Sequence, residues 1–372
     1  MISQSPKRSE IRVLFILEYF APYKGGVERL FSNMIKQLSS EGAQCTVITG
    51  NYSHLSHEEE CFGARIVRIN APNRYLFSIK AIKMAIGLAA HHHIIHTSTY
   101  TAALPAWIAS IVRRKPCILT VHEYWGKLWW KLPFLKAHHR FLFWLYEQLI
   151  IRLHFSHYVG VSEFTTSRLS SLHPSSKVST IYNGLTDENS SLEQSLERTH
   201  YLFVGRLGVS KGLDILIPAI QRLYEQQLDI KFTLVIPDQP KIIFDYIQSQ
   251  LAIALKHGNI NILHDLSDEA LVKQYTTAKA VIIPSYSEGF GFVAAEAMKY
   301  QTPIIHSGKG ALAEIVGGKN ISISPFDQYG LCVAILVAEN EQFQFSPRKY
   351  FPISKTTAKY TDLYNSFIAA SN

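Results

Sequence analysis

Two glutamates flank a glycine-containing turn in the segment PSYSEGFGFVAAEAM. Glu288 stands directly before Gly-Phe-Gly, and Glu296 follows eight positions later, inside the helix that FVAAEAMKY predicts. A carboxylate accepts paired hydrogen bonds from neighbouring hydroxyls, as found on a ribose or a hexose. Glycines let the backbone approach a ligand closely, and N–H groups at a helix N-terminus suit a phosphate or a polar sugar. The segment therefore predicts one glutamate for each of two polyols.

Other interpretations of the same residues stay open at this point. Glu288 could be a charge at a helix start, favoured there by the helix dipole. Glu296 lies among alanines, which is a poor place for an idle carboxylate. GFGFVA also fits the dinucleotide-binding pattern GxGxxA, but Pro284 and a polar stretch separate it from the preceding strand. That pattern requires the glycines directly after a strand, so the match is weak.

A second set of charged residues lies in YLFVGRLGVSKGLDILIPAI. A strand ends at Gly205, and Arg206 and Lys211 flank the short loop that leads into a helix. Arginine binds phosphate through two parallel hydrogen bonds, and lysine binds it as a point charge. The pair predicts neutralisation of a diphosphate leaving group, and a solvated loop is the alternative.

The first half of the chain contributes two weaker candidates. Gly25 and Gly26 precede a helix, a place where backbone contacts an anion, although a tight turn explains them equally. His122 follows the strand ILTV and could hydrogen-bond a sugar or move a proton, although a surface histidine is also common. The cluster HHHIIH suggests a metal by count alone. Adjacent histidines entering a strand point to opposite faces, so we expect no metal.

Short apolar runs alternate with amphipathic segments along the whole chain. The expected strands are RVLFIL, QCTVIT, RIVRI, HIIHTS, CILTVH and YVGVS in the first half, and YLFVG, KFTLVI, INIL, AVIIPS, PIIHS and ISISP in the second. Continuous apolar strands separated by helices are typical of parallel sheets covered on both faces. Two successive sets predict an α/β chain with two Rossmann-like, doubly wound domains. Ligands of such sheets bind beyond the carboxyl ends of the strands, so we expect a cleft between the domains.

The domain boundary is expected where polar residues and Asn-Gly interrupt the pattern, in VSTIYNGLTDENSSLEQS. We place the first domain at residues 1–185, the second at 186–352, and a final helix at 353–372. The length of 372 residues agrees with two domains, since one core rarely organises so long a chain. Four scattered cysteines without a CxxC pair suggest reduced thiols and a cytoplasmic location.

The combination of GGVER, a strand-end VHE, IYNG, VGRL-x-x-x-KG and SEGFGFVAAEAM-x-x-x-TPII resembles the retaining GT-B glycosyltransferases of family 4 (glycosyl transferases group 1). The resemblance covers nearly the whole chain. It implies an acceptor-side first domain, a second domain that binds a nucleotide sugar, and a final helix that crosses back to the first domain. It further implies retaining, metal-independent sugar transfer, and we expect a hexose-type sugar and a lipid-linked or polysaccharide acceptor. No cofactor is implied besides the nucleotide-diphosphate sugar as co-substrate.

The resemblance also implies roles for individual residues. In the second domain, Glu296 would hold the nucleotide ribose and Glu288 the donor sugar near its reacting carbon. Arg206 and Lys211 would bind the diphosphate. The other expected contacts are main-chain amides of Gly289, Phe290 and Gly291 to sugar hydroxyls, Gly25 and Gly26 beside the transferred sugar, and His122 in the sugar pocket.

Three segments depart from the family pattern. VIPDQPKI stands where Gly-Asp-Gly is usual, Gln301 where glycine commonly precedes Thr-Pro, and GALAE, ending at Glu314, where GGLPE is common. These departures concern the nucleotide base and the phosphates. They leave the two glutamates and the Arg/Lys pair untouched.

Charge is unevenly distributed along the chain. Residues 1–190 hold 21 Lys/Arg against 12 Asp/Glu, a net +9, while residues 191–372 hold 16 against 17, a net −1. Residues 113–152 carry eight Lys/Arg, two Asp/Glu and four of the five tryptophans. Basic residues interleaved with aromatics fit contact with an anionic membrane surface on its cytoplasmic side, whereas a helix with core aromatics and solvated lysines is the alternative. We expect no nucleic acid as a partner.

Two rival functions remain. The same double-sheet architecture hosts sugar-nucleotide epimerases, which would convert the nucleotide sugar without any acceptor. A basic module that binds membrane or nucleic acid without catalysis would also explain the charge of the first half. The hypothesis of a binding module without catalysis gives the two glutamates no function.

Overall fold

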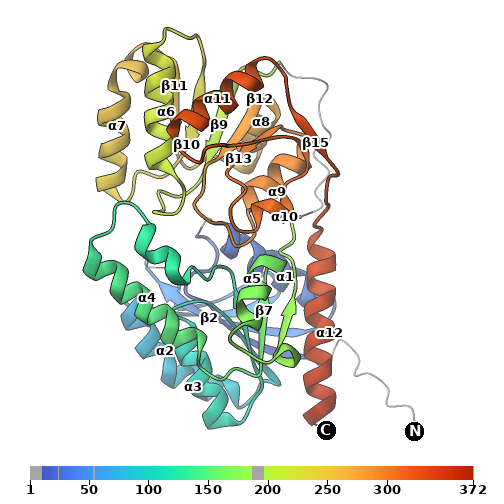
Figure 1. The fold of residues 1–372 in the computed structure, drawn as a ribbon. Coiled ribbons are helices and arrows are strands. Elements are labelled where there is room, and N and C mark those ends of the chain that lie inside the picture. The colour runs from blue at the N-terminus through green and yellow to red at the C-terminus, as the bar shows by residue number, and fades with distance from the viewer. Residues whose placement is uncertain (1–10, 24, 53–54, 187–196, 372) are drawn as a thin grey trace. The chain divides into compact units, whose positions relative to one another are not determined.

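The computed structural model describes residues 11–23, 25–52, 55–186 and 197–371. The chain forms two compact units, which are described separately (Figure 1). Unit 1 comprises Met1–Gly126, Phe143–Asp187 and Phe351–Asn372, and unit 2 comprises Lys127–Leu142 and Glu188–Tyr350. The polar stretch 187–196, on which part of the expected domain boundary falls, lies outside the described residues.

Unit 1 is built on an eight-stranded sheet with the order β3-β4-β2-β1-β5-β6-β7-β8. The strands are β1 (Arg12–Ile16), β2 (Gln44–Asn51), β3 (Glu58–Cys61), β4 (Ala64–Asn70), β5 (Ile94–Ser98), β6 (Cys117–Val121), β7 (His157–Gly160) and β8 (Val178–Thr180). β3 runs antiparallel to β4, and the other pairs run parallel. The central strands are largely buried on both faces because helices cover both sides of the sheet.

The helices of unit 1 divide between the two faces of the sheet. They are α1 (Gly26–Ser40), α2 (Arg74–Ala89), α3 (Ala103–Arg113), the end of α4 (Ala137–Ile151), α5 (Glu163–Ser170) and α12 (Ile353–Ser371). Leu14 of β1 shares one buried core with residues of α2, α3 and α4. The next residue, Phe15, points to the opposite face and contacts Phe31 of α1 and His96. His96 in turn contacts Tyr364, so α12 closes this second face.

The segment that leaves unit 1 after residue 185 pairs with the segment that returns to it at residue 351. The Leu185 N–H donates to Phe351 O over 2.8 Å, and the Ile353 N–H donates to Leu185 O over 2.8 Å. A Cβ on Gly184 would lie 2.4 Å from the Cα of Ile353, so a side chain has no room there. The glycine of IYNG therefore lets the outgoing and returning segments pair.

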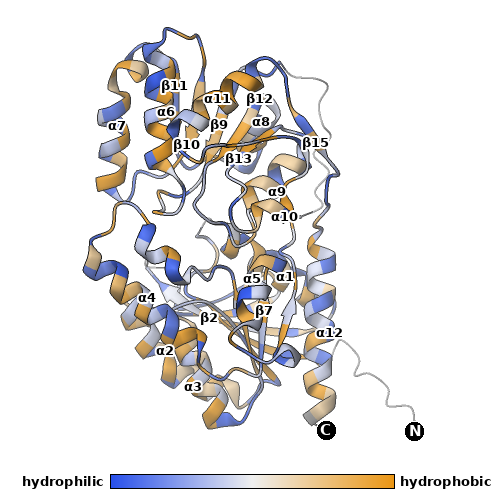
Figure 2. Ribbon diagram, in the orientation of Figure 1, coloured by the Kyte–Doolittle hydropathy of each residue, from blue (hydrophilic) through white to orange (hydrophobic). Residues whose placement is uncertain are grey.

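Unit 2 contains a seven-stranded sheet with the order β11-β10-β9-β12-β13-β14-β15. The strands are β9 (His200–Val204), β10 (Phe232–Val235), β11 (Ile260–Leu263), β12 (Ala278–Ile283), β13 (Ile304–His306), β14 (Gly318–Ser322) and β15 (Gln344–Ser346). Helices α6 (Leu213–Glu225), α7 (Lys241–Lys256), α8 (Asp268–Thr277), α9 (Phe292–Lys299), α10 (Leu312–Ile315) and α11 (Gln328–Glu339) alternate with them. The strands are mostly hydrophobic (Figure 2), and their side chains join those of α6, α7 and α11 in one core.

The predicted fold class, α/β with two doubly wound sheets, is confirmed. Each expected strand overlaps an observed one. The short strands β3, β8 and β15 were not predicted, because none of them has a continuous apolar run. Residues 127–142, which the sequence assigns to the first domain, group with unit 2.

Candidate functional site

Unit 2 holds the candidate residues Lys211 and Glu288, which form an ion pair. Lys211 Nζ donates to Glu288 Oε1 over 2.7 Å, and the hydroxyl of Ser285 donates to the same oxygen over 2.6 Å. Glu288 is only 7% exposed, so its charge is compensated inside the protein. The two predicted residues, 77 positions apart, are thus brought together beside the carboxyl end of β12.

Gly212 is what allows the Lys211 loop to approach the turn after β12. Its φ is +68°, and a Cβ would lie 1.8 Å from Pro284 O. On the other side of Lys211, Ser210 O accepts from the Tyr286 N–H over 2.7 Å. Any side chain at residue 212 would force the two segments apart. Gly212 is therefore required because the Lys211 loop lies close to the turn after β12. This close packing positions Lys211.

The glycine turn leads directly into α9. Gly291, with φ +88°, is the N-cap residue of that helix, and Phe290 is buried with 3% exposure. The loop GKGALAE, which contains the segment that differs from the family pattern, packs on this turn. The Ala311 N–H donates to Glu288 O over 2.8 Å. A Cβ on Gly310 would lie 2.4 Å from the same oxygen. The structure thus gives the GALAE segment a role in holding Glu288.

Glu296 lies in α9 and has a different partner. Its Oε2 accepts a hydrogen bond of 2.6 Å from the hydroxyl of Tyr275 in α8. Tyr275 was not identified from the sequence, because an isolated tyrosine 21 residues away carries no motif signal. Arg206 is exposed in the loop after β9, where its carbonyl oxygen accepts from the Gly208 N–H over 2.7 Å.

A tyrosine and an aspartate also meet beside the Lys211 loop. The Tyr286 hydroxyl donates to Asp214 Oδ2 over 2.6 Å, which links the turn after β12 to the first turn of α6. Burial, together with the Asp214 carboxylate, raises the pKa of Tyr286. The phenol therefore stays neutral and acts as a donor near neutral pH.

Unit 1, described by itself, holds the other candidate residues. Gly25 is the N-cap residue of α1, and a Cβ there would lie 2.1 Å from Glu28 Oε2. Glu28 is 7% exposed in the first turn of the helix, a position that the dipole favours for a carboxylate. Gly25 and Gly26 thus form a crowded turn in which a side chain on Gly25 would collide with Glu28.

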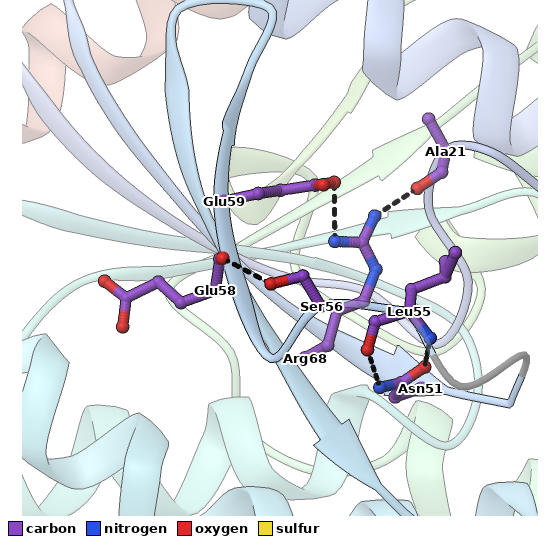
Figure 3. Close-up of polar contacts among 7 residues, drawn as sticks. All are labelled: Ala21, Asn51, Leu55, Ser56, Glu58, Glu59 and Arg68. Carbon is purple, nitrogen blue, oxygen red and sulfur yellow. Dashed lines mark hydrogen bonds and ion pairs between the residues drawn. The ribbon is translucent and has the colours of Figure 1, made fainter.

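Arg68 holds the loop that leads from β1 toward this turn (Figure 3). Its guanidinium donates to Ala21 O over 2.6 Å and to Glu59 Oε1 over 2.7 Å, and its side chain is only 1% exposed. Glu59 belongs to β3, so this edge strand supplies the counter-charge for a buried arginine. In the neighbouring segment, Asn51 exchanges two hydrogen bonds with the backbone of Leu55.

His122 is half-buried at the end of β6, with its ring 5.9 Å from that of Phe31. The loop that follows is held by Glu147 of α4, which is 1% exposed. Glu147 accepts from the Trp125 N–H over 2.8 Å and from the Gly126 N–H over 2.7 Å. Sequence reasoning missed this anchor. Its signal is a lone acid in the apolar run WLYEQLII.

His92 and His96, from the histidine cluster, are buried in unit 1. Within the described ranges, no group of three or more His, Cys, Asp or Glu is placed to hold a metal. Burial, and next the charge of His122, lowers the pKa of His96 to about 3. His92 is tied to Leu88 O and to the hydroxyl of Thr46.

Two family models match the chain in succession. The model described as Glycosyltransferase Family 4 matches residues 24–189, and the model described as Glycosyl transferases group 1 matches residues 186–329. The chain is also similar to an uncharacterized glycosyltransferase of Methanocaldococcus jannaschii, with 32% identity over 157 residues. That match covers 38% of this chain and 39% of the relative, so it spans less than half of the relative's length.

Solved structures resemble the chain over its whole length. Sucrose-phosphate synthase from Thermosynechococcus elongatus superimposes with a TM-score of 0.77 at 18% identity, covering 97% of this chain and 100% of that one. HepE of Anabaena in complex with UDP and glucose superimposes with a TM-score of 0.68 at 16% identity, covering 97% and 99%. At such identities the likeness concerns the fold.

Proposed function

The chain belongs to the family 4 glycosyltransferases and has the GT-B fold, and from this we propose that it transfers a hexose-type sugar from a nucleotide-diphosphate sugar to a lipid-linked or polysaccharide acceptor. We further propose that the anomeric configuration is retained and that no metal takes part. The observation that carries the proposal is the 2.7 Å pair of Lys211 and Glu288 beside the glycine turn. The complex of HepE with UDP and glucose supports a nucleotide sugar as the donor.

In the proposed reaction, an acceptor hydroxyl oxygen bonds to the anomeric carbon while the bond from that carbon to the diphosphate oxygen breaks. The acceptor proton leaves with the diphosphate. Negative charge grows on the departing diphosphate, where Lys211, Arg206 and the N-terminus of α9 stabilise it. Glu288, already held by Lys211, accepts from hydroxyls of the donor sugar, and Glu296 accepts from the ribose. For unit 1 taken by itself, we propose that Gly25, Gly26 and His122 contact a sugar.

A thermal-shift titration of the wild-type protein with UDP, GDP and ADP tests donor binding. One of the three is expected to raise the unfolding midpoint, because a ligand that binds only the folded state stabilises it by mass action. The absence of a shift with all three nucleotides contradicts the proposal.

Product analysis separates the proposed transferase from the epimerase. With the matching nucleotide sugar and no acceptor, a transferase releases at most slow hydrolysis products, whereas an epimerase interconverts the sugar.

NMR of the glycoside then reports the anomeric configuration, and activity in EDTA reports metal independence. An inverted product or complete loss of activity in EDTA contradicts the respective part of the proposal.

A basic and apolar surface supports a further proposal, peripheral contact with an anionic membrane. Within residues 113–152, β6 is buried, so contact falls on the flanking helices. α2, α3 and α4 share one core and therefore lie on the same face of the sheet. Their exposed apolar side chains include Leu76, Ile79 and Met84 of α2, Ile111 and Val112 of α3, and Leu145 and Leu149 of α4. Residues 62–122 contain no Asp or Glu, so α2 and α3 present basic charge only.

This surface is tested by sedimentation with vesicles that contain phosphatidylglycerol, at low salt. Each basic residue near such a membrane contributes about 1 kcal/mol, so binding should weaken as salt rises. Ile79→Glu combined with Ile111→Glu should abolish sedimentation, and Ile253→Glu, at an isoleucine 66% exposed in unit 2, serves as the control. Failure of the wild-type protein to sediment contradicts membrane contact.

Among the described residues, no helix has the length and hydrophobicity to cross a bilayer.

A further inference from the structure

Tyr275 is a buried tyrosine whose hydroxyl points at one of the two motif glutamates. It is 1% exposed, and its hydroxyl donates to Glu296 Oε2 over 2.6 Å. The rest of the residue is fixed independently of that bond. Its ring stacks on Tyr300 with centroids 5.5 Å apart, and its carbonyl oxygen accepts from the Thr302 hydroxyl over 2.7 Å. Tyr275 is therefore a rigid donor.

Such a donor restricts a side chain that would otherwise adopt many rotamers. A free glutamate loses conformational entropy when a ligand orders it, which weakens binding. The bond from Tyr275 fixes the carboxylate before any ligand arrives. An ionised carboxylate has about four lone-pair sites, so acceptor capacity remains for two neighbouring hydroxyls.

Glu288 follows the same pattern. Ser285, itself 1% exposed, donates to Glu288 Oε1 over 2.6 Å, and Lys211 donates to the same oxygen. Both glutamates are thus oriented through one oxygen by a neighbouring side chain. The difference is that Glu288 also has a cation beside it, whereas the Tyr275 bond brings no charge to Glu296.

We propose that Tyr275 is a positioning residue that orients Glu296 for the two ribose hydroxyls of the donor nucleotide. Tyr275 thereby sets the preference of the site for a ribonucleotide over a nucleotide that lacks those hydroxyls. The inference rests on the proposed function, because it takes Glu296 as the ribose-binding carboxylate.

The test uses Tyr275→Phe in the full chain, with Tyr201→Phe as a matched control. Tyr201 is also 1% exposed in unit 2, and its hydroxyl donates to Ile335 O over 3.2 Å in the core. Both variants lose one buried hydroxyl bond, so both should lose a similar amount of thermal stability. Calorimetry then measures the affinity for UDP, GDP and ADP, and for the 2′,3′-dideoxy form of the nucleotide that the wild type binds best.

Tyr275→Phe is expected to weaken binding of the ribonucleotide by about 5–10-fold, the factor that one net hydrogen bond represents. The dideoxy form should bind the variant and the wild type equally, and Tyr201→Phe should bind both nucleotides as the wild type does. Ribonucleotide affinity within about twofold of wild type overturns the inference, and so does an equal loss for the dideoxy form. If the wild type binds none of the three diphosphates, the proposed function itself fails, and the inference falls with it.

Discussion

At the residue scale, the two glutamates of one motif are made different by their partners. Glu288 pairs with the Lys211 cation and with a buried serine hydroxyl, so its charge is balanced within the protein. Glu296 receives a neutral phenol, which orients the carboxylate without cancelling its charge. A carboxylate beside a cation suits the reacting end of the donor, where charge develops. A carboxylate oriented by a neutral donor can accept further hydrogen bonds from a ribose.

Replacing Glu296 tests its share of donor binding. Glu296→Ala should weaken nucleotide affinity by about 1.5–3 kcal/mol, the contribution of a hydrogen-bond partner that carries charge. Calorimetric titration with the nucleotide that binds the wild type measures the loss. Glu225→Ala, at the end of α6, serves as a control because Glu225 accepts a hydrogen bond from Gln221 of the same helix. An unchanged affinity of Glu296→Ala contradicts the ribose role.

Replacing Lys211 tests the chemical step instead. Lys211→Met keeps the length of the side chain and removes the charge, so kcat should fall by about 100–1,000-fold, as when one donor to a developing charge is lost. Lys279→Met removes a lysine that pairs with Glu339 over 2.9 Å elsewhere in unit 2 and should keep the wild-type kcat. Arg206→Ala should also lower kcat. Steady-state rates with saturating donor decide, and a wild-type kcat in the Lys211 variant removes this residue from the diphosphate site.

At the element scale, the sequence predicts what depends on local pattern and misses what depends on pairing across the fold. Most of the parallel strands were predicted because each contains a short apolar run, as in β6, which is buried along its whole length. β3 (EEEC) was missed since its position is set by its pairing with β4. Glu288 and Lys211 were identified by motif, but their ion pair depends on the close approach at Gly212. Tyr275 and Glu147 were missed because their partners come from other elements.

The end of α9 offers a test of helix termination. Gln301 follows the C-cap residue Tyr300 and has φ +55°, a left-handed conformation that favours glycine. Gln301→Gly should therefore raise the free energy of unfolding by about 0.5–1 kcal/mol, since relief of strain exceeds the added entropy of the unfolded chain. Gln342→Gly is the control, because Gln342 has no positive φ and glycine there should destabilise. Urea unfolding measures both, and destabilisation by Gln301→Gly contradicts the argument.

At the scale of the whole molecule, unit 1 combines segments that are far apart in the sequence. α12 returns after unit 2 and places Tyr360 and Tyr364 against the centre of the first sheet. The hydroxyl of Tyr364 lies 2.6 Å from His96 Nδ1, and Thr120 Oγ1 lies 2.8 Å from both His96 Nε2 and the Tyr360 hydroxyl. α12 therefore completes the packing around His96 in unit 1, and burial favours the neutral form of this histidine.

This neutral histidine makes stability depend on pH. Burial, and next the charge of His122, lowers the pKa of His96 to about 3, while in the unfolded chain it returns to about 6.5. Between these values the unfolded chain binds a proton that the folded chain does not. Above pH 6.5, His96 therefore does not lower the free energy of unfolding. As pH falls from 6.5 toward 3, the free energy of unfolding decreases by up to about 1.4 kcal/mol per pH unit.

Urea unfolding of wild type and His96→Gln at pH 7 and pH 5 measures this contribution. The variant should be less stable at both pH values, because the glutamine loses ring contacts with Phe15 and Tyr360. Its loss of stability between pH 7 and pH 5 should nevertheless be smaller than that of wild type by about 2 kcal/mol, since one proton no longer binds the unfolded chain selectively. His257→Asn, at an exposed histidine, controls for removal of an imidazole. Equal pH dependence in wild type and His96→Gln would show that a group other than His96 dominates unfolding by acid.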